Sequence, residues 1–160
     1  MASAAGVAQV GIGEAAWVAG AGVLSTVGLG SCVAVVIHDP VARAGGLVHF
    51  QLADATSDPG RARQQPFLFG DHGISALSQA LASLGCVPVR CKVQVIGGAS
   101  MMAQVSAAQI GKRNVLSARK TLWKLGYLIE REVVGGEVSR SVSLDVARGD
   151  VMIRESGGRS

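Results

Sequence analysis

A mixed α/β domain is the fold that this sequence predicts, and three observations favour it. Short β-branched runs bounded by glycine, proline or aspartate recur along the chain, as is typical of strands. Two segments carry apolar residues at helical spacing. The composition, 49% apolar and 16% charged, is that of a protein with a packed core, and 160 residues suffice for one domain. We therefore expect residues 1–160 to form a single domain with two main helices.

The first half of the chain predicts four strands. We expect strands at 7–12 and 15–19, paired with each other around Gly13-Glu14, and strands at 32–38 (CVAVVIH) and 46–52 (GLVHFQL). The last two are separated by 39–45, which begins with the turn signal Asp39-Pro40. These two strands should therefore pair as an antiparallel hairpin.

The second half alternates helices and strands. Residues 53–70 are polar and lack periodicity, which predicts a long loop. We expect helices at 74–84 and 113–125, strands at 91–96, 128–134, 140–145 and 151–154, a frayed start at 1–6 and a flexible tail at 155–160.

Charge gives a weak indication of partners. The net charge is +4, and five cations fall on the second predicted helix: Lys112, Arg113, Arg119, Lys120 and Lys124. Aromatic residues make up only 4% of the chain, which disfavours stacking on nucleic acid bases. A solvated helix face is the simplest interpretation, and a docking face for an acidic protein partner is the alternative.

Three cysteines, Cys32, Cys86 and Cys91, argue against a disulfide framework, because an odd number cannot pair fully within one chain. Their spacing matches no zinc motif, and we expect no metal or other cofactor. No run approaches the roughly 20 apolar residues of a membrane span, and no secretory signal is recognisable. We expect a soluble cytoplasmic protein.

Cys32 is the candidate nucleophile. It follows a glycine-flanked run with Gly28, Gly30 and Ser31, in which glycine allows tight backbone turns. We expect this turn to hold the thiol open at the mouth of a sheet. His49 comes 17 residues later, and the predicted hairpin brings the start of one strand beside the end of the next. A cysteine and a histidine at the same end of a sheet can form a thiol–imidazole pair.

Thr26 is the candidate for orienting the imidazole, through its hydroxyl or its backbone carbonyl. In this interpretation an imidazolium lowers the pKa of the thiol and stabilises a thiolate. From spacing alone the alternatives stay open: Cys32 as a core thiol, His49 as a structural histidine and Ser31 as a rival nucleophile. His38 is expected in a turn and His72 at a helix start.

The sequence also resembles the CheD family of chemoreceptor glutamine deamidases. The blocks that carry the resemblance stand in family order: LGSCVAV at 29–35, DP at 39–40, GGLVHF at 45–50, IGGASM at 96–101, IGKRNV at 110–115, and a glycine pair at 135–136 followed by Arg140. Departures occur at Gln51, Leu52 and Ala53, and at Ser139 and Ser141, where the family commonly has other residues. They bear on docking more than on bond chemistry.

The resemblance implies a function and a site. It implies that Cys32 is the nucleophile, His49 the base and Thr26 its orienting residue, in an enzyme that converts glutamine side chains of chemoreceptors to glutamate and ammonia. Backbone N–H groups around Gly28, Gly30 and Ser31 would stabilise the oxyanion or shape the site. Gly97, Gly98, Arg113 and Asn114 would shape the fold or the docking surface.

The resemblance also implies a fold and partners. The fold would be a layered α/β sandwich with mixed, largely antiparallel sheets, similar to the catalytic domain of a glutamine-deamidating toxin. The chemoreceptor cytoplasmic domain would be the substrate, and a CheC-type phosphatase a regulatory partner. Receptor methylesterase activity is a further possibility. A non-catalytic binding module that docks receptors or the phosphatase, and a small-molecule amidohydrolase, remain alternatives.

Overall fold

The computed structural model describes residues 6–100 and 105–156. Most of the expected loose ends, residues 1–5 and 157–160, and Met101 of the glycine-rich block therefore lie outside the described residues. Glu155 and Ser156, which were expected in a flexible tail, belong instead to the last strand.

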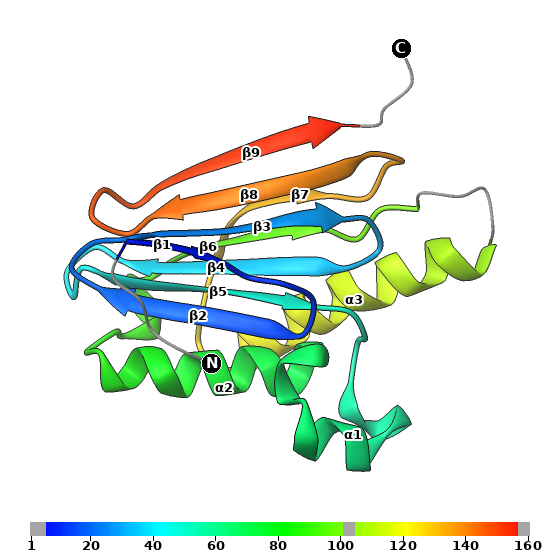
Figure 1. Ribbon diagram of the computed structural model, residues 1–160. Coiled ribbons are helices and arrows are strands. Elements are labelled where there is room, and N and C mark those ends of the chain that lie inside the picture. Colours follow the sequence, from blue (N-terminus) through cyan, green and yellow to red (C-terminus); the bar gives the residue numbers. More distant parts are fainter. Residues whose placement is uncertain (1–5, 101–104, 157–160) are drawn as a thin grey trace.

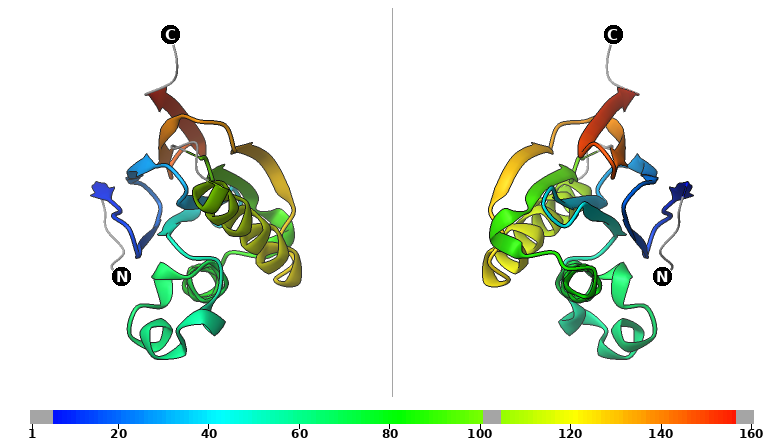
Figure 2. Two further views of the ribbon diagram at one scale, coloured as in Figure 1. Left: turned by 90° about the vertical axis from the view of Figure 1, so that its right-hand side faces the viewer. Right: turned by 90° about the vertical axis from the view of Figure 1, so that its left-hand side faces the viewer.

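Two β-sheets and a layer of helices stack on one another, which confirms the mixed α/β fold (Figures 1 and 2). One sheet has the order β1 (Val7–Gln9), β3 (Val23–Leu29), β8 (Ser139–Asp145) and β9 (Asp150–Ser156). The other has the order β2 (Glu14–Ala19), β5 (Ala44–Phe50), β4 (Val33–Asp39), β6 (Lys92–Gly97) and β7 (Ile129–Val134). Five of the seven pairings between described strands are antiparallel; β1–β3 and β6–β7 are parallel.

The helices are α1 (Pro59–Gln64), α2 (Gly70–Ser83) and α3 (Val105–Lys124). Figure 1 shows α2 and α3 on the side of the five-stranded sheet that faces away from the four-stranded sheet. Among the described residues, no helix is both long and apolar enough to cross a lipid bilayer.

The five-stranded sheet is buried on both faces, and alternate residues of β4 enter two different cores. Val33, Val35 and Ile37 pack with α2 and α3, whereas Ala34 and Val36 pack against the four-stranded sheet. A strand covered on both faces has a nearly continuous apolar sequence, which explains the run CVAVVIH. The inter-sheet core is the layer in which the candidate catalytic residues meet.

The predicted hairpin is confirmed, because β4 and β5 pair antiparallel with Ala34 opposite His49. The predicted pairing of the first two strands is wrong: β1 joins β3 in one sheet, and β2 joins β5 in the other. The chain crosses between the sheets at this glycine-containing turn, where the sequence predicted a hairpin. Strand β3 was missed, because Ser25, Thr26 and Gly28 interrupt its apolar pattern.

The segment 53–70 is not the long loop that its composition predicted. It contains a short 3₁₀ helix at Ala55–Ser57, helix α1 and a second 3₁₀ helix at Pro66–Leu68. Asp54 and Asp58 cap the first two by accepting hydrogen bonds from Thr56 N–H and Arg61 N–H. Both long helices also begin earlier than their apolar spacing indicated, at Gly70 and Val105.

Candidate functional site

Thr26 and His49 meet across the two sheets. Thr26 lies on β3 and His49 on β5, and the Thr26 Oγ1 atom is 2.8 Å from His49 Nδ1. Thr26 is fully buried and His49 is 1% exposed. The expected orienting contact is thus present, and it is made by the threonine hydroxyl rather than by its carbonyl.

The hydrogen bonds around Thr26 define the tautomer of His49. The Thr26 hydroxyl donates its one proton to the Val10 carbonyl, at 2.6 Å. It can therefore only accept from His49, so Nδ1 carries the imidazole proton. The other nitrogen, Nε2, is buried and has no hydrogen-bond partner among the described residues. A buried lone pair without a partner is what a general base needs.

Cys32 lies on the same face of the sheet as His49. It directly precedes β4, packs in the inter-sheet core, and stands two residues before Ala34, the strand partner of His49. Residues in this diagonal relation across an antiparallel pair are about 7–8 Å apart at their backbones, within reach of an imidazole side chain. The thiol is only 7% exposed, so the expectation of a thiol held open at the mouth of a sheet is wrong.

Burial makes the resting pair neutral. It raises the pKa of the Cys32 thiol, and a hydrogen bond from the cysteine's own backbone N–H offsets this only in part. Burial also lowers the pKa of His49 to about 4. Because a low dielectric disfavours both charged forms, these directions oppose the thiolate–imidazolium pair that the residue types suggested. The site instead holds a neutral thiol and a neutral imidazole in one core, and His49 Nε2 makes no hydrogen bond to the sulfur or to any other described atom.

Close backbone packing holds the loop that carries Cys32. The Cys32 carbonyl accepts from Gly98 N–H at 2.9 Å, and the Gly30 carbonyl accepts from Ala99 N–H at 2.8 Å. At Gly97, which has φ +117°, an added Cβ would lie 2.2 Å from the Cys32 carbonyl oxygen. Only glycine fits there, which gives the glycine pair of the IGGASM block a structural role.

The candidate oxyanion residues have distinct backbone roles. Gly28 has φ +73° and accepts from Gly30 N–H at 3.1 Å, so the Gly30 N–H is already engaged within the turn. The Ser31 carbonyl accepts a hydrogen bond from α3. Of the N–H groups in this turn, that of Cys32 is the one directed at its own sulfur. Through these bonds, Gly28, Gly30 and Ser31 shape the loop around the Cys32 thiol.

Asn114 ties together the two segments that carry the thiol and the imidazole. Its Nδ2 atom donates to the Ser31 and Gln51 carbonyls, each at 2.9 Å, and the side chain is 1% exposed. Ser31 precedes Cys32, and Gln51 follows His49 by two residues. Asn114 Oδ1 is buried without a partner among the described residues. The IGKRNV block signalled this position, but its spacing from Cys32 did not indicate the contact.

The other histidines and cysteines lie elsewhere. His38 is buried in β4, not in a turn, and its Nε2 is 2.8 Å from the Val146 carbonyl. His72 is exposed in the first turn of α2. Cys86 and Cys91 pack in the core between the five-stranded sheet and the helices. Among residues 6–100 and 105–156, no group of three or more histidine, cysteine or acidic residues is placed to hold a metal ion.

Comparison with known proteins gives consistent matches. Residues 51–155 match the sequence model of the family described as CheD chemotactic sensory transduction. The chain is 44% identical over 135 residues to a probable chemoreceptor glutamine deamidase CheD of Solibacter usitatus, covering 84% of this chain and 80% of that protein. It is 36% identical over 149 residues to the chemoreceptor glutamine deamidase CheD of Thermotoga maritima, covering 93% and 92%.

The extent of the last match matters, because Thr26, Cys32 and His49 precede residue 51, where the family match begins. A match over 93% of 160 residues leaves about 11 residues outside, fewer than precede Thr26. The aligned region therefore includes all three positions.

Two solved structures also match. They are a hypothetical protein YfiH of Bacillus licheniformis, at 14% identity, and protein NMB0706 of Neisseria meningitidis, at 12%. Both have a TM-score of 0.44. The matches cover 74% and 83% of this chain but only 49% and 63% of those two proteins.

Proposed function

Because this chain belongs to the CheD family of chemotactic sensory transduction proteins, we propose that it hydrolyses the side-chain amide of glutamine on a chemoreceptor. Family membership confirms the resemblance drawn from the sequence blocks. The relatives named above are described as chemoreceptor glutamine deamidases, and most of their length is covered by this chain. The product of this reaction is a glutamate side chain, with release of ammonia.

One observation carries the proposed chemistry: the unpartnered Nε2 of His49 in the inter-sheet core that also holds the Cys32 thiol. The Thr26 hydroxyl holds the imidazole in the tautomer that leaves this nitrogen free to accept a proton. A buried cysteine and a buried histidine that served packing alone would not need this tautomer. Such a pair is the arrangement that activates a thiol by general base catalysis.

In the first half-reaction, the Cys32 sulfur attacks the glutamine Cδ while its proton passes to His49 Nε2. A tetrahedral oxyanion forms, and the Cys32 backbone N–H, which is directed at the sulfur, is its candidate donor. His49 then delivers the proton to the amide nitrogen, the C–N bond breaks, and ammonia leaves. The enzyme is left as a thioester on Cys32.

In the second half-reaction, His49 takes a proton from water, and the resulting hydroxide attacks the thioester carbonyl. The C–S bond breaks, the glutamate product leaves, and the proton on Nε2 returns to sulfur. Because the resting pair is neutral, charge develops only during each step. The proton bonded to Nδ1 stays directed at Thr26 throughout, so the ring keeps its orientation.

The proposal extends to location and partners. A chemoreceptor presents its modifiable glutamines on its cytoplasmic domain, so we place this enzyme in the cytoplasm. We also propose a CheC-type phosphatase as a regulatory partner, as the resemblance to CheD implies. Binding of such a phosphatase to the purified chain, measured by calorimetry, tests this part separately.

The central test uses mass spectrometry of a chemoreceptor cytoplasmic fragment incubated with the wild type or with Cys32→Ala. Conversion of glutamine to glutamate adds about one dalton to specific peptides, and we expect this gain with the wild type only. Circular dichroism checks that the variant is folded. No mass gain with the wild type, together with tight binding of the fragment, would instead support the non-catalytic docking module.

A further inference from the structure

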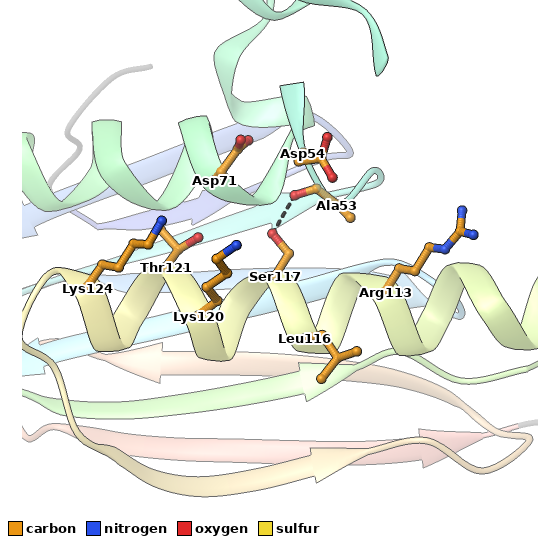
Figure 3. A pocket seen from close by; sticks show the side chains of 9 residues that line it. All are labelled: Ala53, Asp54, Asp71, Arg113, Leu116, Ser117, Lys120, Thr121 and Lys124. Atoms are coloured by element: carbon orange, nitrogen blue, oxygen red, sulfur yellow. Dashed lines mark hydrogen bonds between the residues drawn. The ribbon is translucent and has the colours of Figure 1, made fainter. Parts of the chain in front are cut away.

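A groove runs along one side of α3, outside the inter-sheet core. Its larger part is a cavity of about 390 Å³ between α3 and the start of α2, shown in Figure 3. A second cavity of about 200 Å³ shares three residues with it: Ala53, Asp54 and Arg113. Since the two cavities have these walls in common, we treat them as one feature and call it the α3 groove. Its volume is in the range of pockets that hold ligand side chains.

Free cations line one wall of the α3 groove. Arg113, Lys120 and Lys124 are exposed and project from α3 (Figure 3), and within the described part of the chain none has an ion pair or a hydrogen bond. Arg119, on another face of the same helix, is instead held by Glu132. Among the described cations of α3, Arg119 is therefore ion-paired, whereas the three that line the groove are free.

Two carboxylates lie across the groove from these cations, and neither forms an ion pair with them. Asp71 accepts hydrogen bonds from Ala55 N–H and His72 N–H, and Asp54 accepts from Thr56 N–H. These bonds organise the backbone of the opposite wall, which is tethered to α3 where the Ser117 hydroxyl donates to the Ala53 carbonyl (Figure 3). Three cations and two carboxylates therefore line the groove, and the net charge of its lining is +1.

The groove ends beside the catalytic segments. Asn114 lines its smaller cavity, and the same side chain bonds the carbonyls of Ser31 and Gln51, next to Cys32 and His49 in the chain. A polypeptide whose glutamine reached Cys32 would have neighbouring residues within reach of the groove. The buried Oδ1 of Asn114, which has no partner among the described residues, lies at this junction.

The spacing of the cations along α3 indicates the kind of ligand that the groove binds. Arg113 and Lys124 are 11 residues apart on a helix, a distance of about 16 Å along its axis. A single small anion cannot bridge them, whereas carboxylates spread along a protein segment can. Among the described residues no aromatic side chain lines either cavity, so this part of the groove offers no platform on which nucleic acid bases would stack.

We infer that the α3 groove binds an acidic segment of the substrate protein, adjacent to the glutamine that is modified. This inference rests on the proposed function for the identity of the substrate. It adds a docking subsite, separate from the thiol–imidazole pair, through which the enzyme selects glutamines with acidic residues near them. Complementary charge across such a subsite speeds encounter and selects partners.

The test compares two charge-reversed double variants of equal net charge. Lys120→Glu/Lys124→Glu changes the groove, and Lys92→Glu/Arg131→Glu changes exposed cations on β6 and β7 that line neither cavity. With a chemoreceptor fragment as substrate, we expect the groove variant to raise KM on the order of tenfold at low salt, with kcat unchanged. The control variant should change KM less than twofold. Equal effects of the two variants, or none, would overturn the inference.

A binding experiment separates this inference from the proposed function. Cys32→Ala, with and without the groove substitutions, is titrated with the same fragment. If the wild type does not deamidate but the groove substitutions still weaken binding selectively, docking stands and the proposed chemistry fails. Poly-L-glutamate and duplex DNA serve as competitors at equal charge concentration. We expect poly-L-glutamate to compete, and stronger competition by DNA would overturn the choice of an acidic protein segment.

Discussion

Two regions of this molecule hold buried cysteines in very different surroundings. Cys32, at one end of the inter-sheet core, and Cys86 and Cys91, in the core beneath the helices, are all 7–8% exposed. Cys86 donates to the Ala44 carbonyl and Cys91 to the Val87 carbonyl, and their charged neighbours are Asp39 and Arg90. Cys32 instead shares its core with an imidazole of defined tautomer. Burial therefore does not distinguish the two regions, whereas the neighbouring base does.

The largest expected effect is on kcat, and it differs between Cys32 and the other two cysteines. Cys32→Ser should lower kcat for deamidation by about a thousandfold or more, because a hydroxyl is a far weaker nucleophile beside a neutral imidazole. Cys86→Ala and Cys91→Ala should each leave kcat within about twofold, since neither thiol lies in the inter-sheet core. Ammonia release from a receptor fragment measures all three. A large loss of kcat in a folded Cys86→Ala protein would contradict this distinction.

In the region of Cys86 and Cys91, the buried Asp39 contributes to the stability of the fold. Burial acts to raise its pKa, but hydrogen bonds from Val87 N–H and Arg90 outweigh this and hold the pKa at about 2. Asp39→Ala removes the acceptor of these bonds, and we expect the free energy of unfolding to fall by about 3 kcal/mol or more. Urea denaturation measures this. Asp150→Ala, at an exposed aspartate, is the control and should change the value by less than about 0.5 kcal/mol.

The inter-sheet region should respond to acid. His49 stays neutral in the folded protein down to about pH 4, whereas in the unfolded chain it titrates near pH 6.5. Between these values the unfolded chain binds more protons, so the free energy of unfolding decreases as the pH falls. His49 should account for about 2–3 kcal/mol of the loss between pH 7 and pH 4.5.

Denaturation of the wild type and of His49→Gln at both pH values isolates this contribution, which the variant should lack. Activity should follow the same titration and persist at pH 5.5, where an ordinary histidine would be largely protonated. A kcat/KM profile that falls with a midpoint near pH 6.5 would show that His49 is not held neutral by burial.

Thr26→Val gives the smallest of these effects. The substitution keeps the shape of the side chain but removes the acceptor for the Nδ1 proton, so the imidazole can adopt either tautomer. We expect kcat to fall about tenfold with little change in KM, because only the proton transfers are impaired. Ser25→Ala, in the same strand, is the control. If both variants behave alike, the hydroxyl of Thr26 has no orienting role.

Local patterns in the sequence predicted the hairpin of β4 and β5 and, with it, the placement of Cys32 and His49 at the same end of one sheet. Two strands joined by a short turn have few alternatives, so register follows from sequence spacing. The pairing of β1 with β3 could not be predicted in this way. Thr26 contacts His49 as expected, yet its strand was not predicted, because polar residues and glycine interrupt the apolar pattern.

Burial was the second property that spacing could not supply. A glycine-rich turn before Cys32 suggested an open thiol, and residue types suggested an ion pair. The two sheets enclose the pair and remove water, which reverses the direction of both pKa changes. Asn114 likewise needed the structure, because its two bonds join segments that lie 83 and 63 residues away in the chain.

The contact between Thr26 and His49 is also a joint between two layers of the molecule. The threonine belongs to one sheet, the histidine to the other, and the Val10 carbonyl that completes the chain of bonds lies where the backbone passes between them. The turnover rate therefore depends on the position of the two sheets relative to each other. A partner protein that binds both sheets and shifts one relative to the other by a fraction of an ångström would change the rate of deamidation without contacting the thiol.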